Sequence, residues 1–531
     1  MGNMKTPGVY ILEKNAFPNS VVEVATAVPA FIGYTEIAEN KGNDLHNKPW
    51  LITSMAEFEQ YFGGEPTAKH VRFSLTAMAV PTPPAAGSPP PPPAPVAPPT
   101  VLGARDAVPL NAGGTKYLLQ QTSGLYLLHY SMRLFFQNGG GSCYIVSVGT
   151  YNSKPGVQVA AADFLAGIKE LEKEQEPTMV VMPECILLNQ GECFSTQVQA
   201  LMHCGQVMQN RMAILDVWEG YQERNAPGGD YITKFRGGLG INALAYGAAY
   251  YPWVNSSIVA ERDLSYANLD TASQTELMSA INTELATLTN NADKLALQTA
   301  EVAKISTVTA DDEVQLLAKS LVSMSPFFNA IITEMTKRLN LLPPSGAMAG
   351  IYTMVDNGRG VWKAPANVSL NSVTSPSVPI SRVQQEDLNV TPQGKSINAI
   401  RSFIGEGTLV WGARTLDGNS LDWRYINVRR TMIMMEESIR MAAKAMVFEP
   451  NVANTWVTVK GMISNFLTGI WKRGGLAGAV PEDAFSVHVG LGETMTPEDI
   501  LEGILRVTVL VAISRPAEFI EITFQQQMQK S

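Results

Sequence analysis

The sequence predicts a mixed α/β (α+β) protein of several lobes, with a mostly parallel central sheet, an inserted helical lobe and β arms at both ends. Three observations support this fold class. Apolar runs alternate with helical segments from residue 139 to 254, a proline-free stretch rich in helix formers begins at 258, and short β-branched runs lie near both termini. At 531 residues, the chain is long enough for roughly three or four domain-sized lobes.

Composition narrows the classes of function. Only 16% of the residues are charged, where about a quarter is usual, so we expect a large surface to be buried against other copies of the chain. The net charge of −9 argues against a nucleic-acid partner, which requires a basic surface. No apolar run of about eighteen residues occurs, so we expect no direct membrane insertion. The four cysteines lack CxxC spacing, which favours a reducing cytoplasm over a zinc site or a disulfide framework.

The first elements along the chain are a short strand and a spacer. Residues 8–13 are predicted to form a β-strand that follows Thr6 and Pro7. Residues 81–99 hold eleven of the 33 prolines, which excludes a helix or a central strand and favours an extended polyproline II segment. We expect a solvated spacer between two β segments; a ligand for a proline-binding module is the alternative.

The segment from Gly139 to Val254 predicts the central sheet. Buried strands are expected at residues 143–148, 178–182 and 213–217, with helices at 161–176, 197–210 and 240–249. This alternation predicts mostly parallel strands with covering helices. A helical lobe is then predicted at residues 258–340. The apolar residues that recur there at helical spacing predict a packed seam rather than a cofactor or partner groove: Leu277, Ile281, Leu285 and Leu288.

The C-terminal segment is well organised but carries no catalytic group. An amphipathic helix is predicted from Trp456 to Trp471, and glycines end it after Lys472 and Arg473. Thr496 followed by Pro497 predicts the start of a second helix. Strands are predicted at residues 505–513 and 518–524, separated by Ser514, Arg515 and Pro516.

No catalytic, cofactor-binding or metal-binding residues are predicted. Gly394-Lys395-Ser396 resembles the end of a phosphate-binding loop, but Asn389 replaces its first glycine and no strand precedes it. Gly237 and Gly238 are interpreted as small residues that allow tight packing at the start of a helix, because the third glycine of a dinucleotide-binding motif is missing. The glycines at residues 139–141 are expected to make a turn between a helix and a strand rather than to bind an anion. We expect His203 to be a core histidine rather than a metal ligand.

Terminal strands must pair with something, and strand addition between copies of the chain would build a lattice. Several sequence blocks then resemble contractile-tail sheath proteins. They include residues 7–10, 25–33, 134–144, 248–253, 361–367, 400–403, 410–416, 423–430 and 515–519. These blocks span both termini and most of the chain outside residues 65–115 and 255–340. The chain looks most similar to the sheaths of phage-tail-like extracellular injection systems.

The resemblance implies a tail-sheath fold and a structural, non-enzymatic role. Members of this family stack in rings, usually of six subunits, around an inner tube, and contract irreversibly to drive that tube forward. Partners implied are the tube, baseplate and cap proteins and further sheath paralogues. The particle would assemble in the cytoplasm and then act as a phage tail or an extracellular injection particle. A static shell or surface-layer protein, or an α/β enzyme, are the alternative functions.

Residues receive roles by the same resemblance. Inter-subunit strand exchange is expected at Val9, Tyr10, Ile11, Leu12, Val507, Val509, Val511, Phe519, Ile520 and Ile522. Hinges are expected in residues 15–24 and 514–516, at Asn15, Pro18, Ser514 and Pro516. The candidate tube-facing residues are Lys472, Arg473, Glu482, Asp483, Glu498 and Asp499. The expected domains are an N-terminal arm and linker (1–24), a sheath domain (25–64, 116–254 and 343–448), a surface insertion (65–115), a helical outer lobe (255–342), an inner domain (449–504) and a C-terminal arm (505–531).

Overall fold

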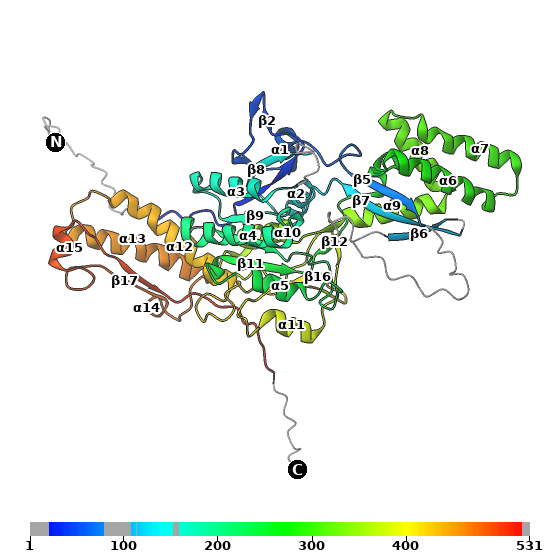
Figure 1. Cartoon of the computed structure of the whole chain (residues 1–531). Coiled ribbons are helices and arrows are strands. Elements are labelled where there is room, and N and C mark those ends of the chain that lie inside the picture. The colour runs from blue at the N-terminus through cyan, green and yellow to red at the C-terminus, as the bar shows by residue number, and fades with distance from the viewer. Residues whose placement is uncertain (1–20, 79–107, 113, 152–158, 523–531) are drawn as a thin grey trace, which may run out of the picture. The chain divides into compact units, whose positions relative to one another are not determined.

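The computed structural model describes residues 21–78, 108–112, 114–151 and 159–522 (Figure 1). The chain divides into two compact units. The C-terminal unit comprises Met1–Thr26, Arg359–Ala364 and Asn427–Ser531, and the central unit comprises Ala27–Gly358 and Pro365–Ile426. The finer domain boundaries expected from the sequence stay predictions. The strand predicted at residues 8–13, the hinge residues Asn15 and Pro18 and the proline-rich segment 81–99 lie outside the described residues.

A mixed sheet of eight strands forms the core of the central unit. Its six inner strands are parallel, and an antiparallel strand closes each edge, which confirms the predicted mostly parallel sheet. Every residue of β1 is buried, as expected for a strand covered on both faces. In spatial order the strands are β16 (Gly407–Trp411), β15 (Asn398–Phe403), β11 (Gly247–Tyr251), β10 (Met212–Asp216), β9 (Met179–Val181), β1 (Pro29–Thr35), β8 (Cys143–Thr150) and β4 (Trp50–Ile52).

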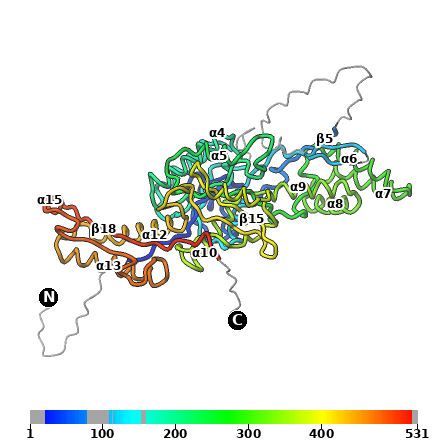
Figure 2. Tube along the Cα trace, turned by 90° about the horizontal axis from the view of Figure 1, so that it is seen from below, coloured from blue at the N-terminus to red at the C-terminus, as the bar shows by residue number. Residues whose placement is uncertain are grey.

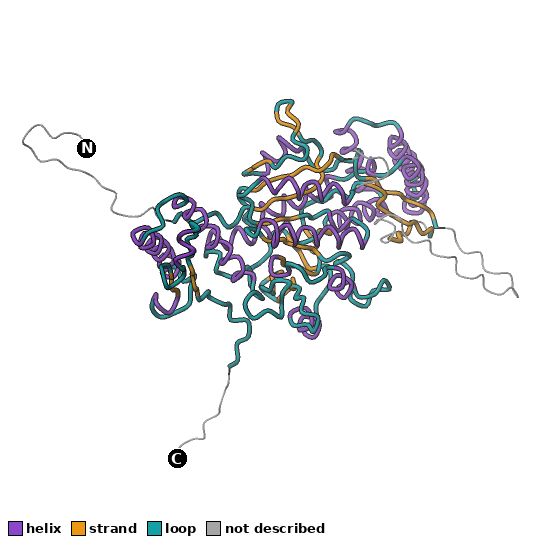
Figure 3. Tube along the Cα trace, turned by 60° about the vertical axis from the view of Figure 1, so that its left-hand side comes forward, coloured by secondary structure: helices purple, strands orange, loops and turns teal. Residues whose placement is uncertain are grey.

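Helices cover this sheet (Figure 3). Helices α2 (Leu128–Gln137) and α3 (Ala161–Glu170) pack against β1, and α4 (Gln190–Met202) packs against β10. Helix α4 begins earlier than predicted, because the Asn189 side chain caps it by accepting a hydrogen bond from the Glu192 N–H. It continues into a π-helical turn, His203–Met208. The central unit also contains the helices α1 (Met55–Phe62), α5 (Tyr231–Gly238), α10 (Ser345–Arg359) and α11 (Arg382–Asn389) outside the helical lobe.

Two local predictions in this unit are wrong. Residues 240–249 do not form a helix, because Gly247 to Tyr251 form β11 between β10 and β15. A Cβ atom on Gly247 would lie only 2.3 Å from Leu201, so the small residues here reflect close cover of the sheet rather than helix propensity. Gly238 ends α5 instead of opening a helix. The tight packing predicted for it is confirmed, since a Cβ there would lie 2.1 Å from Phe194.

The predicted helical lobe is present, and it also contains a sheet that the sequence analysis missed. Strands β5 (Arg72–Ala77) and β6 (Val108–Ala112) flank β7 (Thr115–Ser123), and the Leu75 N–H donates a 2.7 Å hydrogen bond to Ser273 of the first lobe helix. Leu277, Ile281 and Leu285 are buried as predicted, whereas Leu288 is 59% exposed. The helices are α6 (Thr271–Leu288), α7 (Ala292–Ala303), α8 (Asp311–Met324) and α9 (Pro326–Leu339).

Two small sheets complete the central unit. They are the hairpin of β2 (Glu39–Asn40) with β3 (Asn43–Asp44), and the sheet of β13 (Leu341–Leu342), β12 (Val254–Ser256) and β14 (Val373–Pro376). Within the described part of the chain, no single helix is both long and apolar enough to cross a membrane. Only α8 and α9 taken together reach that length and composition, and they are bent by 118°.

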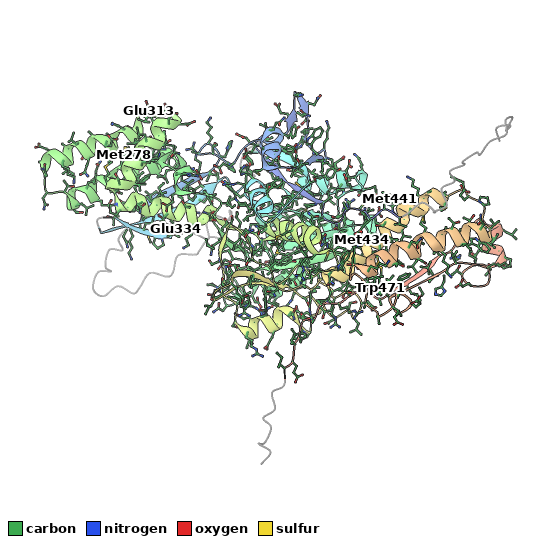
Figure 4. All side chains as sticks on the ribbon, turned by 180° about the vertical axis from the view of Figure 1, so that it is seen from behind. Met278, Glu313, Glu334, Met434, Met441 and Trp471 are labelled. Carbon is green, nitrogen blue, oxygen red and sulfur yellow. The ribbon has the colours of Figure 1, made fainter. Side chains whose placement is uncertain are left out.

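The C-terminal unit consists of two long helices and a hairpin (Figure 2). Helix α13 (Ala453–Lys472) buries Val459, Met462, Ile463, Leu467 and Ile470, which confirms the predicted amphipathic helix. Met434 of α12 (Ile426–Ala443) belongs to the same apolar core (Figure 4). The remaining elements are α14 (Pro481–Ala484), β17 (Phe485–His488), α15 (Pro497–Leu501) and β18 (Thr508–Val511). Helix α15 begins as predicted, with Thr496 and Asp499 forming a capping box.

Candidate assembly site

The predicted C-terminal strand is confirmed in shortened form as β18, and it first pairs within its own chain. Val509 lies opposite Val487, and Val511 lies opposite Phe485, in an antiparallel hairpin with β17. The apolar side chains of Val507, Val509 and Val511 pack on the core of the C-terminal unit. One edge of β18 and one face of its side chains are therefore used within the chain, and the strand exchange expected at these residues stays a prediction.

The second edge of β18 is open. The Ala512 N–H donates to the Ala484 carbonyl at 2.8 Å, so positions 484 and 512 form a hydrogen-bonded pair. Because such pairs alternate along an antiparallel ladder, Val509 and Val511 are in non-hydrogen-bonded pairs, and their N–H and C=O groups point away from β17. No hydrogen bond of these four groups to a described residue is found. An unpaired row of this kind is a template for another strand.

The residues after β18 are exposed and apolar. Phe519, Ile520 and Ile522 are 70% to 79% exposed, although such residues are normally buried. The described part of the predicted strand 518–524 ends at residue 522, and residues 518–522 do not form a strand. No strand of the described part of the chain pairs with residues 519–522, and a β segment needs such a partner for its backbone hydrogen bonds.

The base of the N-terminal arm is anchored on α12. The Val24 N–H donates to the Ser438 hydroxyl at 3.1 Å, and Arg430 donates to the Thr26 carbonyl at 2.9 Å. Val21 and Val24 pack on the core of the C-terminal unit. These contacts hold Val24 against α12, and the hinge expected in residues 15–24 stays a prediction.

The start of the C-terminal tail is anchored on the same helix. Asn427 of α12 donates to the Ser514 carbonyl at 3.1 Å, and the Ser514 hydroxyl donates to the Gly474 carbonyl at 3.0 Å. The Ser514 N–H donates to the Gly475 carbonyl at 3.3 Å. Ser514 is therefore held by three hydrogen bonds. Of the two expected hinge residues here, Pro516 suits a hinge better than Ser514, because proline has no N–H to donate to a strand ladder.

The six candidate tube-facing residues fall into two groups. Lys472 is the last residue of α13 and Arg473 caps its C-terminus, and α14 with Glu482 and Asp483 packs beside that helix. Glu498 and Asp499 belong to α15, which lies near the opposite end of α13, where Asn451 donates to the Ile504 carbonyl at 3.0 Å (Figure 1). A helix of 20 residues is about 30 Å long, so the six residues do not form one patch.

Two of these six residues already have charged partners in the chain. Arg473 contacts Glu23 at 2.5 Å and lies 5.0 Å from the centre of the Trp362 ring. Asp499 contacts Arg506 at 3.0 Å, and the hydrogen bond from this guanidinium lowers the pKa of Asp499. Both pairs are at least partly exposed, so each is expected to contribute little to stability.

The buried acids of the central unit act as caps. Glu184 accepts hydrogen bonds from the N–H groups of Tyr34 (2.7 Å), Leu127 (2.7 Å) and Leu128 (3.0 Å), which satisfies the start of α2. Burial raises the pKa of Glu184 to about 7 despite these donors. Asp216 accepts from the Ser345 N–H at the start of α10, and burial raises its pKa to about 7. Among the described residues, no cluster of three or more His, Cys, Asp or Glu side chains could hold a metal ion.

A known family matches the part of the chain that contains this assembly site, and curated proteins match parts of the chain. Residues 419–527 match the family model described as phage tail sheath C-terminal domain. The tail sheath protein of Vibrio phage KVP40 is 26% identical over 164 residues, which are 30% of this chain and 23% of that protein. The chain spans about a quarter of the length of the curated relatives that it matches.

Solved structures extend the likeness over the whole chain. The sheath complex of PVC, an extracellular contractile injection system in its contracted state, has a chain that is 26% identical with a TM-score of 0.57, and the match covers 99% of both chains. The chain has the fold of a contractile sheath protein. A chain of the 6-fold symmetrised baseplate structure of the anti-feeding prophage, AFP, is 25% identical with a TM-score of 0.55, over 99% of this chain and 100% of that one.

The sheath fold explains where sequence reasoning succeeded and where it did not. Residues 427–522 of the chain supply the open strand edge and the exposed tail, which fall in the strands predicted at residues 505–513 and 518–524 from β-branched runs. The anchors Asn427, Arg430 and Ser438 were missed. These polar side chains are buried in α12 at 1%, 5% and 0% exposure, and buried polar groups need partners, but this burial is visible only in the structure.

Proposed function

We propose that this protein is the structural subunit of a contractile sheath, which stacks in rings around an inner tube and contracts to drive that tube through a target envelope. The open edge of β18 is the observation that carries the proposal. Among the described residues, the N–H and C=O groups of Val509 and Val511 have no hydrogen-bond partner, and an exposed apolar tail follows the strand. The likeness to the PVC sheath complex over 99% of the chain supports the same function.

Strand exchange supplies the contact between subunits in this proposal. Val9, Tyr10, Ile11 and Leu12 of one subunit, or Phe519, Ile520 and Ile522 of another, would add to the open edges of the hairpin. Backbone ladders fix the direction and register of an added strand, while the exposed apolar side chains provide burial. Subunits joined in this way stay connected when they rotate, because only the segments between arm and body need to bend.

Contraction in this proposal requires no fuel molecule. Free energy stored during assembly is released when subunits form larger mutual contacts, which is the behaviour of a bistable interface. Each subunit would take part in stacked rings of six, a number supported by the 6-fold symmetry of the AFP baseplate structure. Baseplate, cap and tube proteins and sheath paralogues are the proposed partners, with assembly in the cytoplasm before the particle acts in a phage tail or outside the cell.

The tube contact stays part of the proposal, with two separate candidate faces. One face comprises Lys472 and Arg473 with α14, and the other comprises α15. Weak, screened charge pairs suit a contact that must release on contraction. Reversing Lys472 and Arg473 to Glu tests the first face, and reversing Glu498 to Lys tests the second. Extended assembly that depends on the tube and is unchanged by a reversal removes that face from the candidates.

Electron microscopy of the protein expressed with and without its tube partner tests the function. We expect tubular assemblies of two lengths, an extended form with the tube and a contracted form without it. A chain lacking residues 1–14 should remain a folded monomer and form no long sheath, because one strand of each exchange is gone. A single lattice geometry under all conditions would instead indicate a static shell, and normal tubes from the shortened chain would contradict strand exchange.

A further inference from the structure

A cavity of about 280 Å³ lies in the central unit, where the end of β7, the start of β6 and the C-terminal part of α9 come together. Its walls include the aromatic side chains of Tyr126, Tyr130, Tyr221 and Trp253. The Tyr221 and Trp253 rings are 5.1 Å apart, at an angle of 52°. The cavity is at the small end of the usual range for ligand pockets, so it suits a short stretch of a ligand rather than a bulky cofactor.

Helix α9 contributes a cationic edge to this cavity. Lys337 and Arg338 both line it, together with Glu334. The Arg338 Nε atom lies 3.6 Å from the nearer Glu334 oxygen, which is too long for a hydrogen bond. This Nε is buried and has no hydrogen-bond partner among the described residues. Because an unsatisfied buried donor is costly, the cavity calls for an acceptor that the described residues do not provide.

The chain itself carries a segment with the matching chemistry. Val108, the first residue of β6, lines the cavity, and the undescribed residues 79–107 lead directly to it. Pro99 precedes Val108 by nine positions, so the two are at most about 30 Å apart. Prolines offer flat apolar rings and carbonyl acceptors but no N–H, and aromatic-lined grooves recognise such segments.

We propose that the aromatic cavity binds a short stretch of the chain's own proline-rich segment, residues 81–99. Proline rings pack on Tyr221 and Trp253, and a backbone carbonyl of the segment accepts the hydrogen bond that Arg338 Nε has left to give. The contact ties the segment to the lobe formed by β5 to β7 and α6 to α9. It involves neither the hairpin nor the terminal arms, so its test is separate from that of sheath assembly.

The test uses the full-length chain with residues 81–99 replaced by a Gly/Ser segment of equal length. The probe is a fluorescent synthetic peptide of residues 81–99, and its binding is followed by anisotropy. We expect saturable binding to the replaced chain and at least tenfold weaker binding to the natural chain, whose own segment competes. In the replaced chain, Arg338→Gln should weaken binding about tenfold through loss of one charge-assisted hydrogen bond. Arg262→Gln, at a side chain 83% exposed and outside the cavity, should leave binding unchanged.

Several results would overturn the proposal. One is the absence of saturable binding to the replaced chain, and another is equal binding of a peptide with serine at every proline. Equal binding to the natural chain at monomer concentrations would show that its own segment does not occupy the cavity. Because Arg338→Gln could disturb α9, circular dichroism melting must match the parent, and Lys337→Gln serves as a second variant. Unchanged binding in both variants would place the peptide elsewhere.

Discussion

Val509→Pro should weaken association between subunits and leave the fold of the chain intact. The N–H of Val509 points away from β17, so Val509→Pro removes no hydrogen bond of the hairpin. The outward groups of Val509 and Val511 offer four ladder hydrogen bonds, worth about 2–6 kcal/mol in total to an added strand. Proline removes one donor and its ring obstructs the incoming strand, for a loss of about 1–3 kcal/mol per contact. Association between subunits should weaken about 5- to 150-fold.

Two further variants isolate the cause. Val509→Ala loses a similar amount of packing on the core but keeps the N–H, so it should assemble at a stability cost of about 1–2 kcal/mol. Leu510→Pro removes an N–H from the hydrogen-bonded pair with Ser486, and it should destabilise the hairpin itself. Melting by circular dichroism reports folding, and electron microscopy of the chain expressed with its tube reports sheath length. Sheaths of normal length and number from folded Val509→Pro would refute the open-edge argument.

Three other predictions concern stability. The pKa of Glu184 is raised, so the folded state holds an extra proton between about pH 4.5 and 7, and stability falls as pH rises through that window. From pH 5 to pH 8, the stability difference between the natural chain and Glu184→Gln, measured by urea unfolding, should shift by about 2.5 kcal/mol in favour of the variant, and a constant difference would contradict this. Gly238→Ala should lower the free energy of unfolding by about 1–3 kcal/mol because its methyl group meets Phe194, while Gly237→Ala, with open space around it, should stabilise the fold slightly. Equal melting temperatures of the two variants would contradict the packing argument. A double-mutant cycle on the half-exposed Arg473 and Glu23 pair, measured by thermal unfolding, should give a coupling free energy below about 1 kcal/mol. A larger value would mean that this pair, rather than the packing of Val21 and Val24, holds the base of the N-terminal arm.

The sequence predicted elements whose pattern is local and failed where distant residues decide. The strand at residues 143–148 and the helix at 456–471 have clear periodicity, and both are present. The segment 240–249 looked helical because alanine favours helices, but a place between β10 and β15 overrides that propensity. The sheet of β5, β6 and β7 was missed because it is completed by a lobe whose helices begin about 150 residues after β7 starts.

The assembly site was predicted in part for the same reason. Strand residues Val509 and Val511 were found from their β-branched character, which is visible in the sequence. Which edge of the strand is open depends on its pairing with Phe485 and Val487, and pairing register is set by the folded hairpin. Residues 519–522 do not form the predicted strand, because no described strand pairs with them and a β segment needs a partner for its backbone hydrogen bonds.

Helix α12 holds the roots of both arms at once. Arg430 and Ser438 hold the segment before residue 27, and Asn427 holds Ser514, all within four turns of one helix. In a sheath built by strand exchange, pull arriving through one arm would pass along this helix to the other arm without crossing the central unit. The load would then be carried by a continuous net of paired arm strands and α12 helices, and little of it would reach the central unit. Its loops and lobes could vary in sequence without weakening the net.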